Sequence, residues 1–568
     1  MTRALLLVVL LAAAVGCQRD EEASTTTVPP SPTAAAKQQL TQATLSDPKT
    51  FNPILVVDSA SAMALEDVFE ALVRLNPKTT EIEPMLAESW EYSADGSACT
   101  FHLRHDVRWQ DGNPFTASDV AFTFKAVFDD RVPNSAKHVL TVDGKPIKVE
   151  TLDESTVRFT APHPFAPLLD SIRAVDILPE HILGPALEKG TFAQQWGIDS
   201  PPGKLIGTGP FRMVQYAQGQ FLRYRRNPDY WMRDEAGKLL PYLEEKILLI
   251  VPNQDALYLK FVGGQTDVHY PRPEEVAELQ TKSAELGLTV SEIGTDTGTQ
   301  FVTFNRNPRH YEHNGKRDPR LNWFTDKTFL KALAHAVDKK SMILNCLNGY
   351  GIPAVAYISP ENRTYHNPNL TDYDYDLDEA RRLLAEGGYV NRAGDLYDKD
   401  GNRVEFNLTT NAGNQIREKM CSILKEDWTK LGMEVNYRPL DFPSLVEKLD
   451  TNFDWDAILI GFTGGIEPQN GANVLRSNGN LHMWNPNQPS PQTEWEKEID
   501  TLLDEGAREL DRAKRQQYYW RIQQILQDEL PMIQTVRARM FVAVRRSVRN
   551  YEPSVWGLYH PERIEIAE

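Results

Sequence analysis

Cysteine is scarce in this chain, which has four among 568 residues. Cys17 lies in an N-terminal leader, so Cys99, Cys346 and Cys421 remain for the folded body. Three thiols cannot all pair, and their spacing matches neither a disulfide framework nor a zinc site. At most one bridge can therefore form, and we expect three free, buried thiols.

The usual signatures of covalent and metal chemistry are missing. The chain has no Gly-x-Ser-x-Gly, no Walker loop, no His-Glu-x-x-His and no Cys-x-x-Cys, and its twelve histidines are scattered. We therefore expect no cofactor, no metal and no catalytic residue. A glycosidase-type pair of carboxylates is assembled in space and cannot be picked from 79 acidic residues, so a secreted hydrolase stays open as the rival class.

Positive charge is in the minority, with 61 Lys and Arg against 79 Asp and Glu and a net charge of −18. Phosphate binding needs clustered Lys and Arg, so the composition excludes nucleic acid as a partner. An acidic surface favours solubility and says nothing firm about the charge of a ligand.

Long apolar runs are absent except for residues 4–15, which follow Arg3 and are too short to span a bilayer. Residues 1–16 fit a signal peptide. The run ends Ala14-Val15-Gly16-Cys17, which resembles a lipobox, in which the cysteine becomes the new N-terminus and its thiol takes a lipid. Residues 17–39 are rich in Thr, Ser, Pro and Ala and predict a flexible linker after the lipidated cysteine.

Residues 85–128 carry the most consistent local signals. Alternation over 99–103 predicts a strand with one buried face, and 107–109 predicts a second short extended run. Thr116 and Asp119 then resemble a capping box at the start of a helix. The apolar residues of that helix fall on one stripe: Val120, Phe124, Val127 and Phe128.

Residues 404–461 predict a β-α-β-α-β unit. Such a unit implies parallel strands joined by right-handed crossovers, with ligands beyond the carboxyl ends of the strands. The segment that emerges there, 461–484, is rich in Gly, Asn, other amides and single aromatics. A loop of this composition on a rigid sheet suits a polar ligand, and a surface loop without ligand is the alternative.

Two further motifs favour structural interpretations. Gly207 and Gly209 precede no helix that could hold a phosphate, so we expect them to permit close approach of backbones in a strand crossing between domains. The spaced aspartates of 373–389 lack the glycine of a calcium loop. They predict instead a helix capped by Asp376 and stopped at Gly387 or Gly388.

Several segments, in order along the chain, resemble the family-5 extracellular solute-binding proteins, which bind peptides, oligopeptides or nickel for bacterial ABC importers. They include DVFEAL from Asp67, LAESWEYSADGSACTFHLRHDVRWQDGNPFTASDVAFTFKAV from Leu86, GTGPF from Gly207 with QGQFLRYRRNPDYW after it, and LKALAHAVDKKSMI from Leu330. The resemblance covers roughly residues 44–568. Recurrence in order is more specific than any one motif.

The resemblance implies an α/β, three-domain, periplasmic-binding-protein-like fold of the class II type, with two lobes joined by a hinge and an extra domain. Domain I, a discontinuous lobe, is expected at 40–75, 204–297 and 531–568. Domain II, the extra domain, is expected at 76–203 and domain III, the second lobe, at 298–530. The hinge crossings are expected near residues 297 and 530.

The implied function is capture of a solute between two closing lobes, without covalent chemistry. Peptide-binding members usually show Gly-Trp followed by an Asp that holds the ammonium of the peptide. Here Phe462 follows Gly461, and Glu467 is the only acid before Asn473. Either Glu467 substitutes or the ligand has no free amine there. We expect an oligopeptide first and an oligosaccharide or other polar metabolite second.

The candidate ligand residues come from two sources. Asp58 and Asn305 are chosen from their positions in the family pattern, whereas the others are chosen from the 461–484 loop: Phe462, Glu467, Asn473, Arg476 and Trp484. The expected partners are the ligand, the permease subunits of an ABC transporter and a membrane reached through the lipid on Cys17. We expect an extracytoplasmic monomer; a surface adhesin or scaffold without an enclosed ligand is a further alternative.

Overall fold

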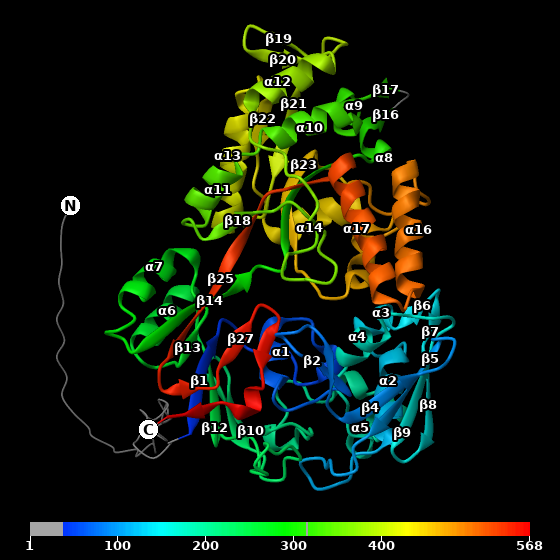
Figure 1. The fold of residues 1–568 in the computed structure, drawn as a ribbon, viewed down its shortest axis with the longest axis vertical. Helices are drawn as coiled ribbons and strands as arrows, with labels where there is room; N and C mark the ends of the chain where they lie inside the picture. Colours follow the sequence, from blue (N-terminus) through cyan, green and yellow to red (C-terminus); the bar gives the residue numbers. More distant parts are fainter. Residues whose placement is uncertain (1–37, 314–315, 568) are drawn as a thin grey trace, which may run out of the picture. The chain divides into compact units, whose positions relative to one another are not determined.

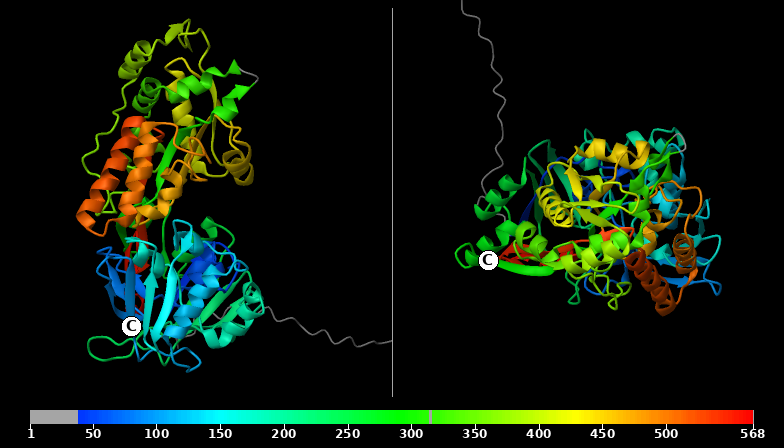
Figure 2. Two further views of the ribbon diagram at one scale, coloured as in Figure 1. Left: turned by 90° about the vertical axis from the view of Figure 1, so that its right-hand side faces the viewer. Right: turned by 90° about the horizontal axis from the view of Figure 1, so that it is seen from above.

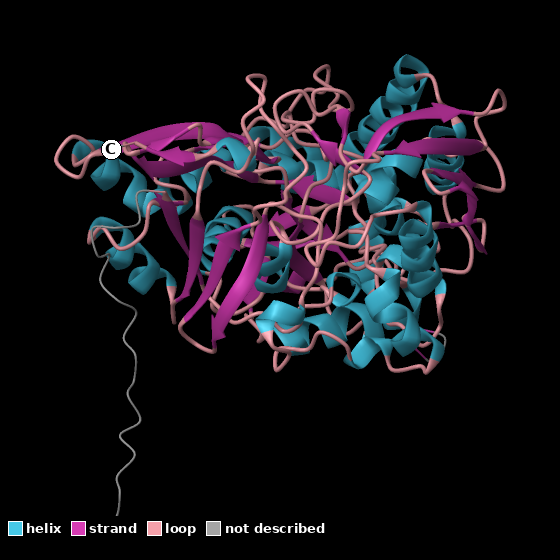
Figure 3. Ribbon diagram, turned by 90° about the horizontal axis from the view of Figure 1, so that it is seen from below, coloured by secondary structure: helices cyan, strands magenta, loops and turns pink. Residues whose placement is uncertain are grey.

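The computed structural model describes residues 38–313 and 316–567. The chain divides into a short unit, residues 1–37, and a compact unit, residues 38–568. The predictions for the signal peptide, for the lipid on Cys17 and for most of the linker therefore lie outside the described residues. Helices and strands are mixed through the compact unit, so the predicted α/β class is confirmed (Figure 1, Figure 3).

The segment with the strongest local signals builds a four-stranded antiparallel sheet. Its strands, in spatial order, are β4 (Ala87–Tyr92), β5 (Ala98–Leu103), β9 (Thr156–Thr160) and β8 (Lys148–Asp153). α2 (Ala117–Phe128) begins with the predicted capping box of Thr116 and Asp119. The predicted strand at 107–109 does not form, because Arg108 makes only a single bridge to Pro114 while the Trp109 side chain turns into the core.

Two further sheets pair strands that are far apart in the sequence. The first contains β1 (Gln39–Thr44), β12 (Glu245–Ile250), β11 (Phe221–Arg226) and β10 (Phe211–Ala217), with β1 parallel to β12. The second contains β13 (Val268–His269), β25 (Val536–Arg545) and β14 (Leu288–Thr295), and β18 (Gly351–Pro353) also pairs with β25. Nearby helices are α1 (Ser59–Leu65), α6 (Gln254–Val262) and α7 (Pro273–Thr281).

The predicted β-α-β-α-β unit is confirmed. It consists of β21 (Glu405–Thr409), α13 (Gln415–Thr429), β22 (Glu434–Tyr437), α14 (Phe442–Glu447) and β23 (Ala457–Phe462). β21 is parallel to both β22 and β23, as the connections require. Two antiparallel strands extend the sheet beyond β23, namely β15 (Thr299–Phe304) and β24 (Met532–Gln534).

The remaining main helices surround this sheet. Before it in the sequence come α9 (Pro319–Thr325), α10 (Lys327–His335), α11 (Lys339–Cys346) and α12 (Leu377–Glu386), which Asp376 caps as predicted. After it come α16 (Glu494–Arg508) and α17 (Arg512–Glu529), which lie side by side (Figure 1, Figure 2).

The chain passes twice between the β13-β25-β14 sheet and the five-stranded sheet. It crosses at residues 296–298, between β14 and β15, and returns at Thr535, between β24 and β25. The second crossing contacts the strand that follows the first, because the backbone nitrogen of Thr535 donates to the carbonyl of Gln300 at 3.0 Å. The second crossing lies beyond the expected position near 530 because β24 first pairs with β15.

Buried apolar side chains form separate cores. The first core takes most of its residues from 40–268 and adds others from 507 and 542–564. The second core consists of two clusters with residues from 301–536. Cys99 lies in the first core and Cys346 and Cys421 lie in the second, so all three are free and buried, as expected.

Gly207 and Gly209 bring two backbones into contact. A Cβ atom on Gly207 would overlap the Val68 carbonyl oxygen, and one on Gly209 would overlap that of Asp67. The Gly209 nitrogen also donates to the Val68 carbonyl at 3.0 Å. The expected close approach is confirmed, and its partner is the segment directly after α1.

Candidate functional site

A cavity of about 250 Å³ lies at the first crossing of the chain. Thr297 and Thr299 line it from the crossing, Tyr357 from the segment after β18, and Tyr519 from α17. The loop after β23 supplies much of the remaining wall through residues 463–471. We call this space the crossing cavity. It lies beyond the carboxyl end of β23, which is the edge of an open α/β sheet where ligands bind.

Glu467 lines the crossing cavity but is already paired. Its two carboxylate oxygens accept hydrogen bonds from the two terminal nitrogens of Arg515, one of them at 2.7 Å. Both side chains are 6% exposed. Burial alone would lower the pKa of the Arg515 guanidinium, but the Glu467 carboxylate outweighs burial and raises it. The guanidinium therefore stays charged, and it lies directly against the Glu467 carboxylate within the wall.

A second recess, of about 370 Å³, adjoins the crossing cavity and shares Asn470 with it. On one side it is lined by the loop after β23, including Asn473 and Arg476, and on the other by residues 138–143 and 163–167. Asn470 also donates a hydrogen bond from its amide to Asp170 of α4 (Leu168–Arg173) at 2.8 Å. The two recesses together form one concave region, whose wall mixes polar side chains with apolar ones.

A third recess, of about 290 Å³, is acidic and is lined by Glu66, Glu70 and Asp176 among others. The Glu66 side chain is exposed at the rim of the recess, but many protein atoms surround its carboxyl group. This desolvation, together with the charge of the nearby Asp67, raises the pKa of Glu66 to about 7. Burial and then the charge of Glu70 raise the pKa of Asp176 to about 6. Both carboxylates therefore change charge close to neutral pH.

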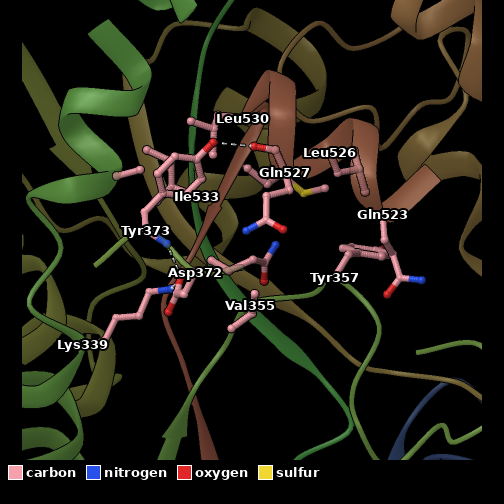
Figure 4. A pocket seen from close by; sticks show the side chains of 13 residues that line it. Lys339, Val355, Tyr357, Asp372, Tyr373, Gln523, Leu526, Gln527, Leu530 and Ile533 are labelled. Carbon is pink, nitrogen blue, oxygen red and sulfur yellow. Dashed lines mark hydrogen bonds and ion pairs between the residues drawn. The ribbon is translucent and has the colours of Figure 1, made fainter. Parts of the chain in front are cut away.

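A smaller cavity, of about 20 Å³, lies behind the crossing cavity and shares Tyr357 and Gln523 with it. Figure 4 shows these two side chains together at one end and Lys339 with Asp372 at the other. The Lys339 ammonium donates to the carbonyl of Ala354 at 2.7 Å and pairs with Asp372. The space suits a single water molecule, so we assign no ligand to it.

Four of the predicted ligand residues lie in or beside the concave region. Glu467 lines the crossing cavity, and Asn473 and Arg476 line the second recess. Phe462 lies at the end of β23, next to this loop, with its ring 5.6 Å from that of Phe301. The Arg476 guanidinium is paired with Asp504 at 2.6 Å, so its charge is partly satisfied.

The other three predicted residues make contacts that hold the fold. Asp58 caps α1 by accepting from the Ser61 nitrogen at 2.9 Å. Asn305 is 0% exposed, and its amide donates to two backbone carbonyls, at 2.8 and 2.9 Å. Trp484 is 1% exposed and donates its indole N–H to Glu496 at 3.0 Å. In this structure none of the three lines the concave region.

The sequence did not identify Tyr357, Tyr519 or Arg515 as site residues. Tyr357 lies in an irregular segment with no periodicity to mark it. Tyr519 and Arg515 lie one helical turn apart on α17, where they look like ordinary positions of a buried face. An arginine on a buried face is the one signal that pointed to a partner, because such a charge is almost never buried unpaired.

Two other kinds of site are absent from the described residues. There, no group of three or more His, Cys, Asp or Glu side chains could hold a metal ion. Across 38–313 and 316–567, no helix is both long and apolar enough to cross a bilayer. Glu467 is the only carboxylate among the residues that line the crossing cavity, and Arg515 neutralises it.

Known proteins resemble this chain over most of its length. A probable ABC transporter-binding protein of Deinococcus radiodurans is 28% identical over 515 residues, which cover 86% of this chain and 85% of that protein. The dipeptide-binding protein of Escherichia coli is 27% identical, with 93% and 94% covered.

Solved structures share the fold. The substrate-binding protein CtaP of Listeria monocytogenes matches with a TM-score of 0.76 at 22% identity, covering 94% of this chain and all of that one. The oligopeptide-binding protein AppA of Bacillus subtilis, solved with a nonapeptide, matches with a TM-score of 0.70 at 24% identity over 94% of this chain and all of that one. The chain shares the mixed α/β, two-lobe fold of these two binding proteins.

The family model for the middle region of the bacterial extracellular solute-binding proteins, family 5, matches residues 81–482, which is well over half of the chain. Members of this family bind solutes outside the cytoplasm. Together with the order of the sheets and the concave region at the crossings, this match identifies the chain as a member of the family 5 bacterial extracellular solute-binding proteins.

Proposed function

We propose that this chain is the substrate-binding lipoprotein of an ABC importer. It captures an oligopeptide between two lobes and delivers it, chemically unaltered, to the permease subunits. The lobes are domain I (40–75, 204–297 and 531–568) and domain III (298–530), with domain II (76–203) as the extra domain. Strand β24, residues 532–534, extends domain III beyond these expected bounds, because it pairs with β15. The observation that carries the proposal is the crossing cavity, which lies at the first chain crossing and is walled by the loop after β23.

Closure of the lobes requires contacts between parts of the chain that have separate cores, and the structure contains such contacts. Asn470 of the loop after β23 reaches Asp170 of α4, which lies in the extra domain and shares one core with domain I, and the second recess is walled by both sides. A ligand that touches both lobes binds their closed arrangement better than the open one and shifts the population by that difference in affinity alone. No bond needs to be made or broken.

The oligopeptide is favoured by the relatives, which include dipeptide-, di/tripeptide- and oligopeptide-binding proteins. An oligosaccharide or another polar metabolite is the second candidate, because the crossing cavity offers hydroxyl, amide and aromatic groups that suit sugars equally well. A hydrolase is less well supported, since the cavity presents one carboxylate rather than two.

The anchor belongs to the same proposal. Cleavage before Cys17 would leave this thiol to be lipidated, and residues 18–39 would tether the compact unit to the membrane as a monomer. One acyl chain binds a membrane only marginally, so stable anchoring requires more than one chain on the cysteine.

Native mass spectrometry of freshly purified protein tests the ligand. We expect bound peptides, released intact on denaturation, from protein that carries Cys17→Ser and is therefore free of lipid. An oligosaccharide mass would favour the second candidate. Cleavage of a peptide or glycan panel, lost on substitution of a single Asp or Glu, would contradict a transport role.

A further inference from the structure

The wall of the crossing cavity contains one acidic group, and its charge is used within the protein. Glu467 accepts two hydrogen bonds from Arg515 and a third from the backbone nitrogen of Gln469, at 2.8 Å. A carboxylate that already has this many donors, one of them a full positive charge, has little left to offer a cationic ligand group.

Arg515 cannot easily turn away from Glu467. Its Nε donates to the carbonyl of Gly506 at 2.6 Å, and one terminal nitrogen donates to the Tyr365 hydroxyl at 2.7 Å. The guanidinium also lies 5.3 Å from the ring centroid of Tyr365 and 5.4 Å from that of Tyr519. Releasing Glu467 for a ligand would therefore leave a buried guanidinium unpaired, which is strongly unfavourable.

The rest of the cavity wall has no compensating negative charge. Its side chains are mainly hydroxyl, amide and aliphatic groups, including Thr297, Ser359 and Ile522. Behind the wall, the buried guanidinium of Arg537 donates to the carbonyls of Ala356 and Tyr357, at 2.9 and 2.8 Å. The Asp296 carboxylate lies close enough to offset part of this charge and does not line the cavity. The neutral wall itself therefore makes the cavity unfavourable for a positive charge.

We propose that the crossing cavity binds an uncharged polar part of the ligand and selects against a free ammonium group. An amide or an acetylated amine would exchange hydrogen bonds with the wall. An ammonium would lose its hydration without gaining a counter-ion, and such a transfer is costly. The inference rests on the proposed function, because it assumes that the ligand occupies this cavity.

Two matched pairs of probes, one of peptides and one of oligosaccharides, test the inference. The first pair is a C-terminally amidated pentapeptide with a free or an acetylated N-terminus. The second pair is a tetramer of N-acetylglucosamine and the corresponding tetramer of glucosamine. Isothermal titration of the full chain should give an affinity about tenfold higher for the acetylated member of any pair that binds.

The two proposals can fail separately. Preference for an acetylated sugar without any peptide binding would contradict the oligopeptide proposal and support the uncharged cavity. A free-amine probe that binds as well as or better than its acetylated partner would overturn the uncharged cavity and leave transport intact. Failure of all four probes would contradict both proposals for the ligand.

Substitution of Arg515 provides an internal test. Arg515→Gln leaves the Glu467 carboxylate without its cation, so the free-amine probe should gain about tenfold relative to the acetylated probe. Glu467→Gln combined with Arg515→Gln removes both charges and should keep the original preference. Arg521→Gln is the matched control, because Arg521 lies on the same helix in an exposed pair with Glu498 at 2.7 Å.

Each variant is first checked by thermal denaturation. If Arg515→Gln does not fold, the double variant and the four probes on the unaltered chain still decide the question. An unchanged probe preference in a folded Arg515→Gln variant would show that Glu467 does not set the charge of the cavity, and would overturn the inference.

Discussion

The carboxylate of Glu496 collects hydrogen bonds from three buried side chains. Trp484 and Gln488 donate to it at 3.0 Å, and His482 lies 3.3 Å away. Burial would raise the pKa of this carboxyl, but hydrogen bonds led by the one from His482 outweigh it and hold the pKa at about 2. The network fixes the end of the 461–484 loop to α16, so the aromatic and amide groups here hold the loop rather than bind a ligand.

Acid should therefore unfold the protein partly through Glu496. The folded pKa of about 2 lies below the ordinary value of 4.5, so the stabilisation is complete above pH 4.5 and is lost as the pH falls towards 2. The full contribution is about 3 kcal/mol. Glu496→Gln should reduce the free energy of unfolding at pH 7. It should also make that free energy fall less steeply between pH 7 and pH 3, as measured by urea denaturation across this range. A variant whose stability falls with pH as steeply as that of the unaltered protein would contradict this role.

At the scale of elements, the turn between α16 and α17 and the residues beside it contact residues within 81–166, which the resemblance assigns to domain II. The Ala507 carbonyl accepts from the Ala166 nitrogen at 2.8 Å, and Leu510 packs against Gly96. Two ion pairs flank these contacts, Arg508 with Asp143 and Arg512 with Glu81. Arg515 ties the same turn to the crossing cavity by donating to the carbonyl of Gly506.

Removing the two ion pairs should make the closed arrangement less stable. Exposed pairs contribute about 0.2–1 kcal/mol each, so Arg508→Gln with Arg512→Gln should weaken ligand binding about twofold to thirtyfold. The loss should shrink at high salt, because exposed charges are screened. Arg521→Gln again serves as the control, since its pair with Glu498 joins α17 to α16 only. Equal losses in the control and in the double variant would contradict a closing role for the turn.

Elements whose signals are local could be predicted. The capping box of α2, the Asp376 cap of α12 and the β-α-β-α-β unit are each set by residues within a short stretch. The sequence could not predict which distant strands pair, such as β1 with β12 and β25 with β14, because no local signal identifies the partner of a strand. The same limit applies to the site: Glu467 was visible in its loop, whereas Arg515 neutralises it from 48 residues away.

At the scale of the whole molecule, two large cores share one chain, which links them by two short crossings and by the contacts around the α16–α17 turn. Each core buries its own apolar residues, and each can lose its packing without the other. Such a protein is a poor candidate for two-state unfolding. A ligand held between the lobes would bind only when both are folded, and this couples their stabilities.

Differential scanning calorimetry should therefore resolve two transitions for the ligand-free protein and merge them when the ligand identified by mass spectrometry is added. At a ligand concentration of 100 times Kd, the stabilisation should be about 2.7 kcal/mol, shared by both cores. A ligand bound by one lobe alone would raise only one transition. Small-angle scattering on the same samples should show a smaller radius of gyration with ligand. A single raised transition with an unchanged radius would mean that this chain holds its ligand without closing around it.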